Sequence, residues 1–123
     1  MKANAVARRR FVWRVMFVAA LVWTAWGSLV PMSSLPPLHV WDKFAHAAIY
    51  ALLTALLLQT QWAPRPWIAA ACVMFFGIVI ELAQAGTAYR SGDWHDALAN
   101  LVGVVLALGA WYGWRRLATS RDP

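Results

Sequence analysis

Ten polar residues lie within or close to the apolar stretches of this sequence, and their types could carry chemistry. They are Asp42, Lys43, His46, Tyr50, Glu81, Gln84, Arg90, Asp93, Asp96 and Asn100. Lysine and arginine can contact an anionic group. A histidine among carboxylates could serve general acid–base catalysis or hold a divalent cation. Which of these applies depends on how closely the fold brings the side chains together.

The spacing of these residues predicts helices that each carry a polar stripe. Residues three or four apart share one helix face, and the stripes that follow are 42–46–50, 81–84 and 96–100. Small residues, Gly103 and Ala107, continue the last stripe and would let a neighbouring helix approach closely. Polar side chains that face lipid are costly, so we expect the stripes to face one another.

Less specific roles remain open for most of these residues. The aspartates at 42, 93 and 96 could each be a helix N-cap, and Asn100 could tie two helices together through its amide. Glu81 follows the apolar run FFGIVI, where no cap is needed. A buried carboxylate must be protonated, paired or hydrated. The available partners are His46, Lys43 and Arg90, so Glu81 is either a functional acid or one member of a structural pair.

The elements that must position these residues are predicted to be membrane helices. The 123 residues are 62% hydrophobic and only 13% charged, too apolar for a soluble fold of this size. Four apolar segments approach the length that crosses a bilayer, at 11–30, 44–62, 67–85 and 97–114. The first lacks a clear cleavage site, so we expect it to be retained. The sequence thus predicts one all-α domain, 1–123, forming a four-helix transmembrane bundle.

The basic residues predict the orientation of this bundle. Eight of the eleven lysines and arginines lie near the termini, and Arg65 lies between the second and third segments. Positive residues favour the cytoplasmic side, so both termini are predicted to be cytoplasmic and the polar stripes to converge near the outer surface. The net charge of +6 is explained by these flanks, and we expect no nucleic-acid partner. A single cysteine, Cys72, excludes an internal disulfide.

Three segments resemble motifs of the VanZ-like family of small bacterial integral membrane proteins. They are DKFAHAAIYALL, GIVIELAQ and YRSGDWHDALANLVG, which match the family's D-K-x-x-H-x-x-x-Y, E-x-x-Q and R-x-x-D-x-x-D-x-x-x-N-x-x-G patterns in order. All ten polar residues fall on these patterns. The resemblance implies a multi-pass protein of the bacterial cytoplasmic (inner) membrane. It also implies a link to glycopeptide resistance, because the family's namesake is linked to reduced susceptibility to teicoplanin.

Three functions remain open from the sequence. The first is a binding module, in which the outward cluster recognises the headgroup of a membrane lipid or a lipid-linked precursor of the cell envelope. The second is a structural subunit of an envelope complex, held together by the polar residues. The third is a lipid-modifying enzyme, although H-E-x-x-H and G-x-S-x-G motifs are both missing. We expect no cofactor and assign no metal ligands, with a divalent metal as the alternative.

Overall fold

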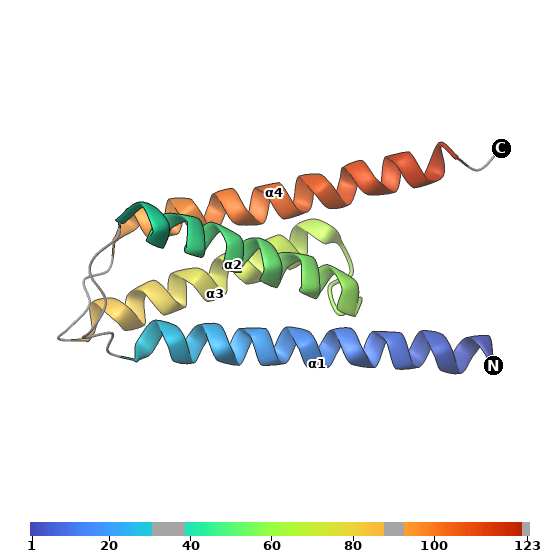
Figure 1. Cartoon of the computed structure of the whole chain (residues 1–123), viewed down its shortest axis with the longest axis horizontal. Coiled ribbons are helices and arrows are strands. Elements are labelled where there is room, and N and C mark those ends of the chain that lie inside the picture. Colours follow the sequence, from blue (N-terminus) through green and yellow to red (C-terminus); the bar gives the residue numbers. More distant parts are fainter. Residues whose placement is uncertain (31–38, 88–92, 122–123) are drawn as a thin grey trace.

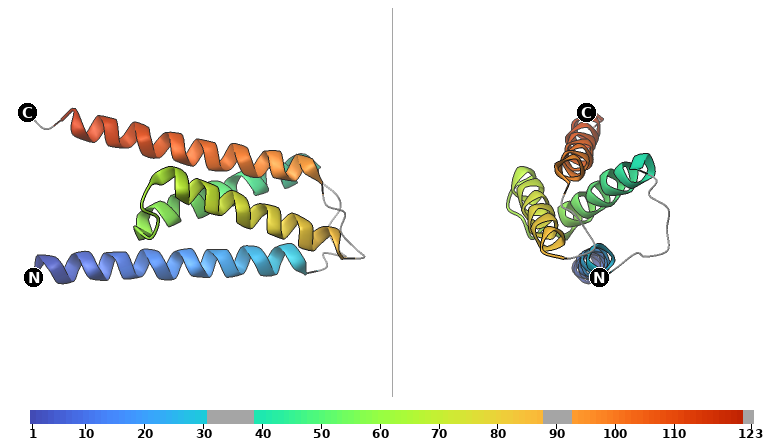
Figure 2. Two further views of the ribbon diagram at one scale, coloured as in Figure 1. Left: turned by 180° about the vertical axis from the view of Figure 1, so that it is seen from behind. Right: turned by 90° about the vertical axis from the view of Figure 1, so that its left-hand side faces the viewer.

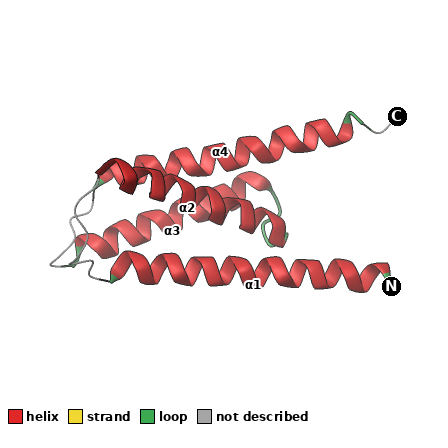
Figure 3. Ribbon diagram, in the orientation of Figure 1, coloured by secondary structure: helices red, strands yellow, loops and turns green. Residues whose placement is uncertain are grey.

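The computed structural model describes residues 1–30, 39–87 and 93–121, and the regular secondary structure in these ranges is all α-helical (Figure 3). The helices are α1 Lys2–Leu29, α2 His39–Thr60, α3 Pro66–Ala85 and α4 Trp94–Thr119. Each is long and apolar enough to cross a membrane. The predicted all-α class and the four membrane spans are therefore confirmed.

Helices α2 and α3 form the middle of the bundle, with α1 on one side and α4 on the other (Figure 2). Helix α2 contacts all three other helices, whereas α1 and α4 do not touch within the described ranges. The longer α1 and α4 extend past the α2–α3 turn at the end that carries both termini (Figure 1). Both termini thus share one end of the bundle, while the side of the membrane they face stays a prediction.

The helix boundaries differ from the predicted spans because hydropathy marks only the apolar part of a helix. Helix α1 begins at Lys2 and α4 continues to Thr119, so both carry their basic residues in helical conformation. Helix α2 begins at His39, which places Asp42 within its first turn. The N-cap alternative for Asp42 is therefore wrong. The same helix ends at Thr60, two residues before the predicted end of its span.

Most of the buried side chains in the bundle are apolar, and so is much of its surface. Leu53, Val73 and Val104 are almost fully buried where α2, α3 and α4 meet. Large apolar side chains such as Trp23 and Phe75 lie exposed on the outside, along with many others. A surface of this kind is unfavourable in water and suits contact with lipid chains, where a helix satisfies its own backbone hydrogen bonds.

The end that carries the termini is fastened by a basic residue of α1. The Arg14 Nε donates to the carbonyl of Thr60, 3.3 Å away, at the last turn of α2. Its guanidinium lies 5.3 Å from the centre of the Trp62 ring, and Phe17 meets the same ring edge-on. A cation at a helix C-terminus satisfies a carbonyl that has no partner within the helix. This contact fixes α1 against the α2–α3 turn.

The opposite end is shaped by a close crossing of α2 and α4. A Cβ atom on Gly103 would lie 2.1 Å from the carbonyl oxygen of Ala47. Only glycine allows the two backbones to approach this far. The predicted role of Gly103 as a small residue at a helix contact is therefore confirmed. One turn before Gly103, Asn100 is brought against α2, where it meets the polar stripe of that helix.

Candidate functional site

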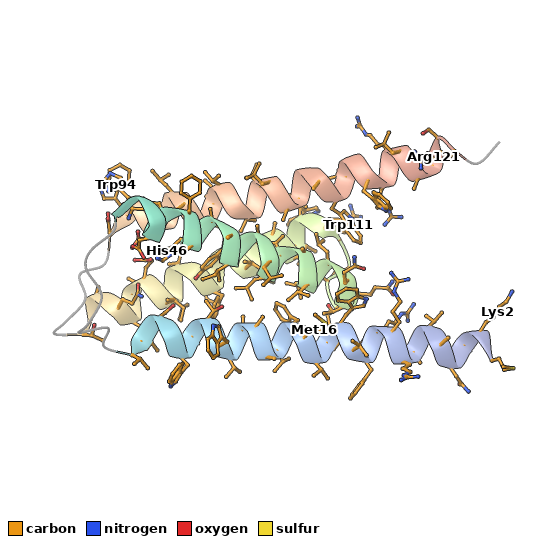
Figure 4. All side chains as sticks on the ribbon, in the orientation of Figure 1. Lys2, Met16, His46, Trp94, Trp111 and Arg121 are labelled. Atoms are coloured by element: carbon orange, nitrogen blue, oxygen red, sulfur yellow. The ribbon has the colours of Figure 1, made fainter. Side chains whose placement is uncertain are left out.

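Polar side chains from three helices meet at the end of the bundle away from the termini, where His46 and Trp94 lie (Figure 4). Helix α2 contributes the first turns of its polar stripe, α3 its last turns, and α4 its N-terminus. We call this group the polar cluster, and its described members are Asp42, Lys43, His46, Glu81, Asp93, Asp96 and Asn100. The sequence prediction that these stripes face one another is consistent with this placement.

Lys43 joins α2 to the N-terminus of α4. Its Nζ lies 3.0 Å from Asp93 Oδ2 and also pairs with Asp96 Oδ1. The Lys43 side chain is 33% exposed and that of Asp96 only 14%, so this pair lies just beneath the surface of the bundle. The ammonium is therefore engaged by two carboxylates and organises the acids around it.

His46 is held in one orientation by a buried amide. Its Nδ1 lies 3.0 Å from Oδ1 of Asn100, and Asn100 is 1% exposed. An amide oxygen only accepts hydrogen bonds, so Nδ1 must carry the proton. The other ring nitrogen, Nε2, lies 3.9 Å from Asp42 Oδ1 and 3.7 Å from Asp96 Oδ2. The imidazole therefore faces two carboxylates with its second nitrogen.

Asp93 is the N-cap of α4, which confirms one of the capping alternatives. Its Oδ1 accepts from the backbone N–H of His95 at 2.9 Å and contacts His95 Nδ1 at 2.8 Å. The hydrogen bond from the His95 backbone, together with those from Lys43 and the His95 ring, holds the pKa of the Asp93 carboxyl well below its usual range. Asp96 lies one turn later in α4, so the capping alternative for Asp96 is wrong.

Glu81 contributes a carboxylate from α3 whose oxygens are both buried. Neither oxygen has a hydrogen-bond partner among the residues that the structure describes. The carboxylate lies within electrostatic reach of His46 and Asp96, and the backbone amide of Asp93 lies nearby without forming a hydrogen bond of good geometry. The pairing of Glu81 with Lys43, one of the expected partnerships, is not observed.

The remaining predicted site residues lie outside the cluster or outside the described residues. Gln84 donates from Nε2 to the carbonyl of Ser28 at 2.9 Å and so ties α3 to the end of α1. Tyr50 is 2% exposed and lies deeper, with its ring against Phe76 at a centroid distance of 6.3 Å. Arg90 lies outside the described residues.

Two contributors to the site were missed by sequence reasoning. His95 was not among the candidate site residues, yet it lies in the first turn of α4 and binds the capping carboxylate through backbone and ring. The usable signal is Asp93 itself, because an N-cap side chain accepts from the backbone N–H of the second or third helical residue, here His95. Gly77 lies beneath Tyr50 and Asn100, where a Cβ would approach their side chains to 2.8 and 3.2 Å. A single glycine inside an apolar run offers no comparable signal.

The polar cluster is acidic, and its side chains differ in how far they are exposed. Its described members include four carboxylates and one ammonium. Asp42 is 57% exposed at the side chain, whereas His46 is 15% exposed and Asp96 14%. A ligand approaching from the membrane surface would therefore meet Asp42 first and His46 behind it. The arrangement offers hydrogen-bond acceptors in excess, which suits hydroxyl groups, amines or a metal cation.

The comparison with protein families agrees with the motifs. The family model described as VanZ/LLP1 matches residues 3–116, which is nearly the whole chain. The chain therefore belongs to the VanZ/LLP1 family. No curated protein and no solved structure matches the chain significantly.

Proposed function

We propose that this VanZ/LLP1 membrane protein binds, through its polar cluster, the headgroup of a lipid or lipid-linked envelope precursor at the outer surface of the bacterial cytoplasmic membrane. The observation that supports the proposal is the placement of partly exposed acids at one end of an otherwise apolar bundle. A lipid-linked ligand has a polar part at that depth and an apolar chain below it. The exposed apolar faces of the helices would accommodate the chain.

The charge of the cluster favours a headgroup rich in hydrogen-bond donors. Lys43 is already paired with Asp93 and Asp96, so it has little capacity left for a phosphate. Asp42 and Asp93 present carboxylates that are more than a third exposed. Carboxylates accept strong hydrogen bonds from hydroxyls and from ammonium groups. A sugar or amino-sugar headgroup therefore fits these residues better than an isolated phosphate.

The proposed link to glycopeptide susceptibility depends on this binding. Teicoplanin-type antibiotics act on the cell envelope, and the resemblance of the motifs implies a role for this family in susceptibility to them. A protein that retains an envelope precursor at the membrane surface would change how much precursor the antibiotic can reach. We therefore expect the susceptibility effect to require the same carboxylates as headgroup binding.

The experiment is native mass spectrometry of the full chain released from mild detergent. The probes are a polyprenyl-diphosphate-linked amino sugar, the polyprenyl diphosphate without sugar, and phosphatidylglycerol. We expect an adduct with the sugar-bearing lipid that Asp42→Asn weakens about ten-fold, as the loss of a hydrogen bond to a charged group predicts. The matched control is Gln59→Ala, at the other end of α2, which should leave the adduct unchanged.

The structural role is a second candidate, because Lys43 physically connects α2 with α4. On this hypothesis the wild type would retain none of the three lipids, and Lys43→Met would lower the melting temperature. Equal retention of sugar-bearing and sugar-free lipid would also contradict headgroup recognition. A wild type that retains the sugar-bearing lipid selectively, with a stable but non-retaining Asp42→Asn variant, would exclude the purely structural role.

A further inference from the structure

We propose a divalent-cation site formed by Asp42 and His46 of α2 and Asp96 of α4, with Glu81 of α3 as a further oxygen ligand. The proposal goes beyond headgroup binding and does not depend on it. Asp42, His46 and Asp96 each offer one ligand atom, and these atoms all lie within 4.8 Å of one another. Three helices would thereby be joined at one ion.

The distances leave room for an ion between the ligand atoms. Nε2 of His46 lies 3.9 Å from Asp42 Oδ1 and 3.7 Å from Asp96 Oδ2. Both distances exceed a charge-assisted hydrogen bond, which measures about 2.7–2.9 Å. Ligands bound at about 2.1 Å from a metal lie roughly 3 Å apart when adjacent. The two distances from His46 therefore need to shorten by less than about 1 Å each, and the exposed Asp42 side chain can move by that amount.

The hydrogen bonds around His46 and Asp96 leave the required atoms available. Because Asn100 fixes the proton on Nδ1, the lone pair of Nε2 points towards the carboxylates. Lys43 pairs with Oδ1 of Asp96, which leaves Oδ2 facing the imidazole. Metal-bound histidines commonly donate their other ring N–H to an oxygen acceptor that fixes the tautomer. Asn100 occupies that position here.

Glu81 of α3 provides a second observation at this end of the bundle. Both of its carboxylate oxygens are buried, and neither has a hydrogen-bond partner within the described part of the chain. The carboxylate interacts electrostatically with His46 and Asp96. It is not one of the groups whose ligand atoms lie within 4.8 Å of one another, so as a ligand it would approach the ion from outside that set. A buried carboxylate without a partner is unfavourable, whereas a cation between Glu81 and Asp96 would satisfy both groups.

The ligand set favours a borderline cation such as Mn²⁺ or Zn²⁺. Carboxylate oxygens suit hard cations, but an imidazole nitrogen favours first-row transition metals and zinc. Magnesium prefers oxygen ligands with several retained waters. We therefore expect Mn²⁺ and Zn²⁺ to compete for one site and Mg²⁺ to displace them poorly.

The experiment measures Mn²⁺ binding by the full chain in detergent after chelator treatment, using equilibrium dialysis with metal analysis. Pulsed electron paramagnetic resonance then detects nitrogen coupled to the bound Mn²⁺. We expect one ion per chain, a nitrogen coupling that His46→Ala removes, and a loss of affinity of at least ten-fold in Asp42→Asn. Gln59→Ala is the control, because Gln59 lies in the last turn of α2, at the other end of the helix from the ligands, and this variant should bind within about two-fold of wild type.

Several outcomes would overturn the cation site. They are less than one Mn²⁺ per chain in the wild type, no nitrogen coupling, or equal weakening by Gln59→Ala and Asp42→Asn. Melting temperatures identify any variant that fails to fold, and the largely exposed Asp42 carboxylate keeps the test decisive if Glu81→Gln is unstable. No lipid probe is present in the Mn²⁺ assay, so a failure to bind Mn²⁺ would not contradict headgroup binding. A failure to retain the sugar-bearing lipid would likewise not contradict the cation site.

Discussion

The crossing of α2 and α4 at Gly103 allows a sharp test of the packing that positions the polar cluster. In a Gly103→Ala variant, the new Cβ would begin 2.1 Å from the Ala47 carbonyl oxygen and 2.9 Å from its carbonyl carbon. The obstacle is backbone, which cannot rotate away as a flexible side chain could. The two helices must therefore move apart, although alanine is the better helix former.

The size of the effect follows from that distance. A carbon–oxygen contact of about 3.4 Å is close to the lower limit of ordinary packing, so the helices must separate by roughly 1 Å at this crossing. Forcing an extra carbon into a packed contact costs about 1–3 kcal/mol. The His46–Asn100 hydrogen bond, now 3.0 Å, spans the same two helices one turn away. We expect it to lengthen or break.

The assay is unfolding of the detergent-solubilised protein by heat or by denaturing detergent. The matched control is Gly109→Ala on the same helix, because a Cβ there meets no atom within 4 Å. That change should be neutral or stabilising by up to about 1 kcal/mol, since alanine favours helix. Equal effects of the two substitutions would refute the close crossing. So would a Gly103→Ala variant with undiminished stability.

Two further changes test other contacts. In Asp93→Ala, α4 loses its N-cap. The pKa of Asp93 in the folded protein is lowered. The stabilisation of the folded state by this carboxylate should therefore be full above the ordinary aspartate pKa of about 3.9 and decrease as the pH falls below it. The melting temperatures of wild type and variant should therefore converge on acidification, and a constant difference from pH 7 to pH 3 would contradict this. Gln84→Leu removes the donor to the Ser28 carbonyl and should lower the free energy of unfolding by about 1–2 kcal/mol. Faster hydrogen exchange in the last turn of α1 would accompany it, whereas Gln59→Leu at the far end of α2 should change neither measurement.

Much of the fold could be predicted because a bilayer imposes length and composition on every span. Four apolar segments led directly to four helices, and the Pro66 start of α3 follows from the preference of proline for the first turn. The extents of α1 and α4 could not be predicted in the same way. Outside the apolar layer, hydropathy no longer indicates whether the chain stays helical. Charged residues such as Arg9 and Arg115 are compatible with a helix or with a loop, so the ends of α1 and α4 stayed undetermined.

The cluster was predictable where helical spacing decided the outcome. Asp42 and His46 lie one turn apart on one face of α2, and Asn100 meets His46 because Gly103 holds α4 close. Gln84 lies on the same face of α3 as Glu81 by spacing, yet it bonds to α1. Spacing assigns a side chain to a face, but the packing of helices decides which neighbour that face meets.

The distribution of ionisable groups favours chemistry at the membrane surface over transfer across the membrane. At one end of the bundle the described cluster holds Lys43 among acids, and at the other Arg14 binds the last turn of α2. Between these two ends the described interior holds Leu53 and Val73 together with Thr54, whose hydroxyl donates to the Tyr50 carbonyl of its own helix. An ion that crossed the membrane would need polar partners along that interior. A ligand that enters from the membrane surface needs only the polar cluster, so binding at the surface explains the positions of these charged groups with fewer assumptions.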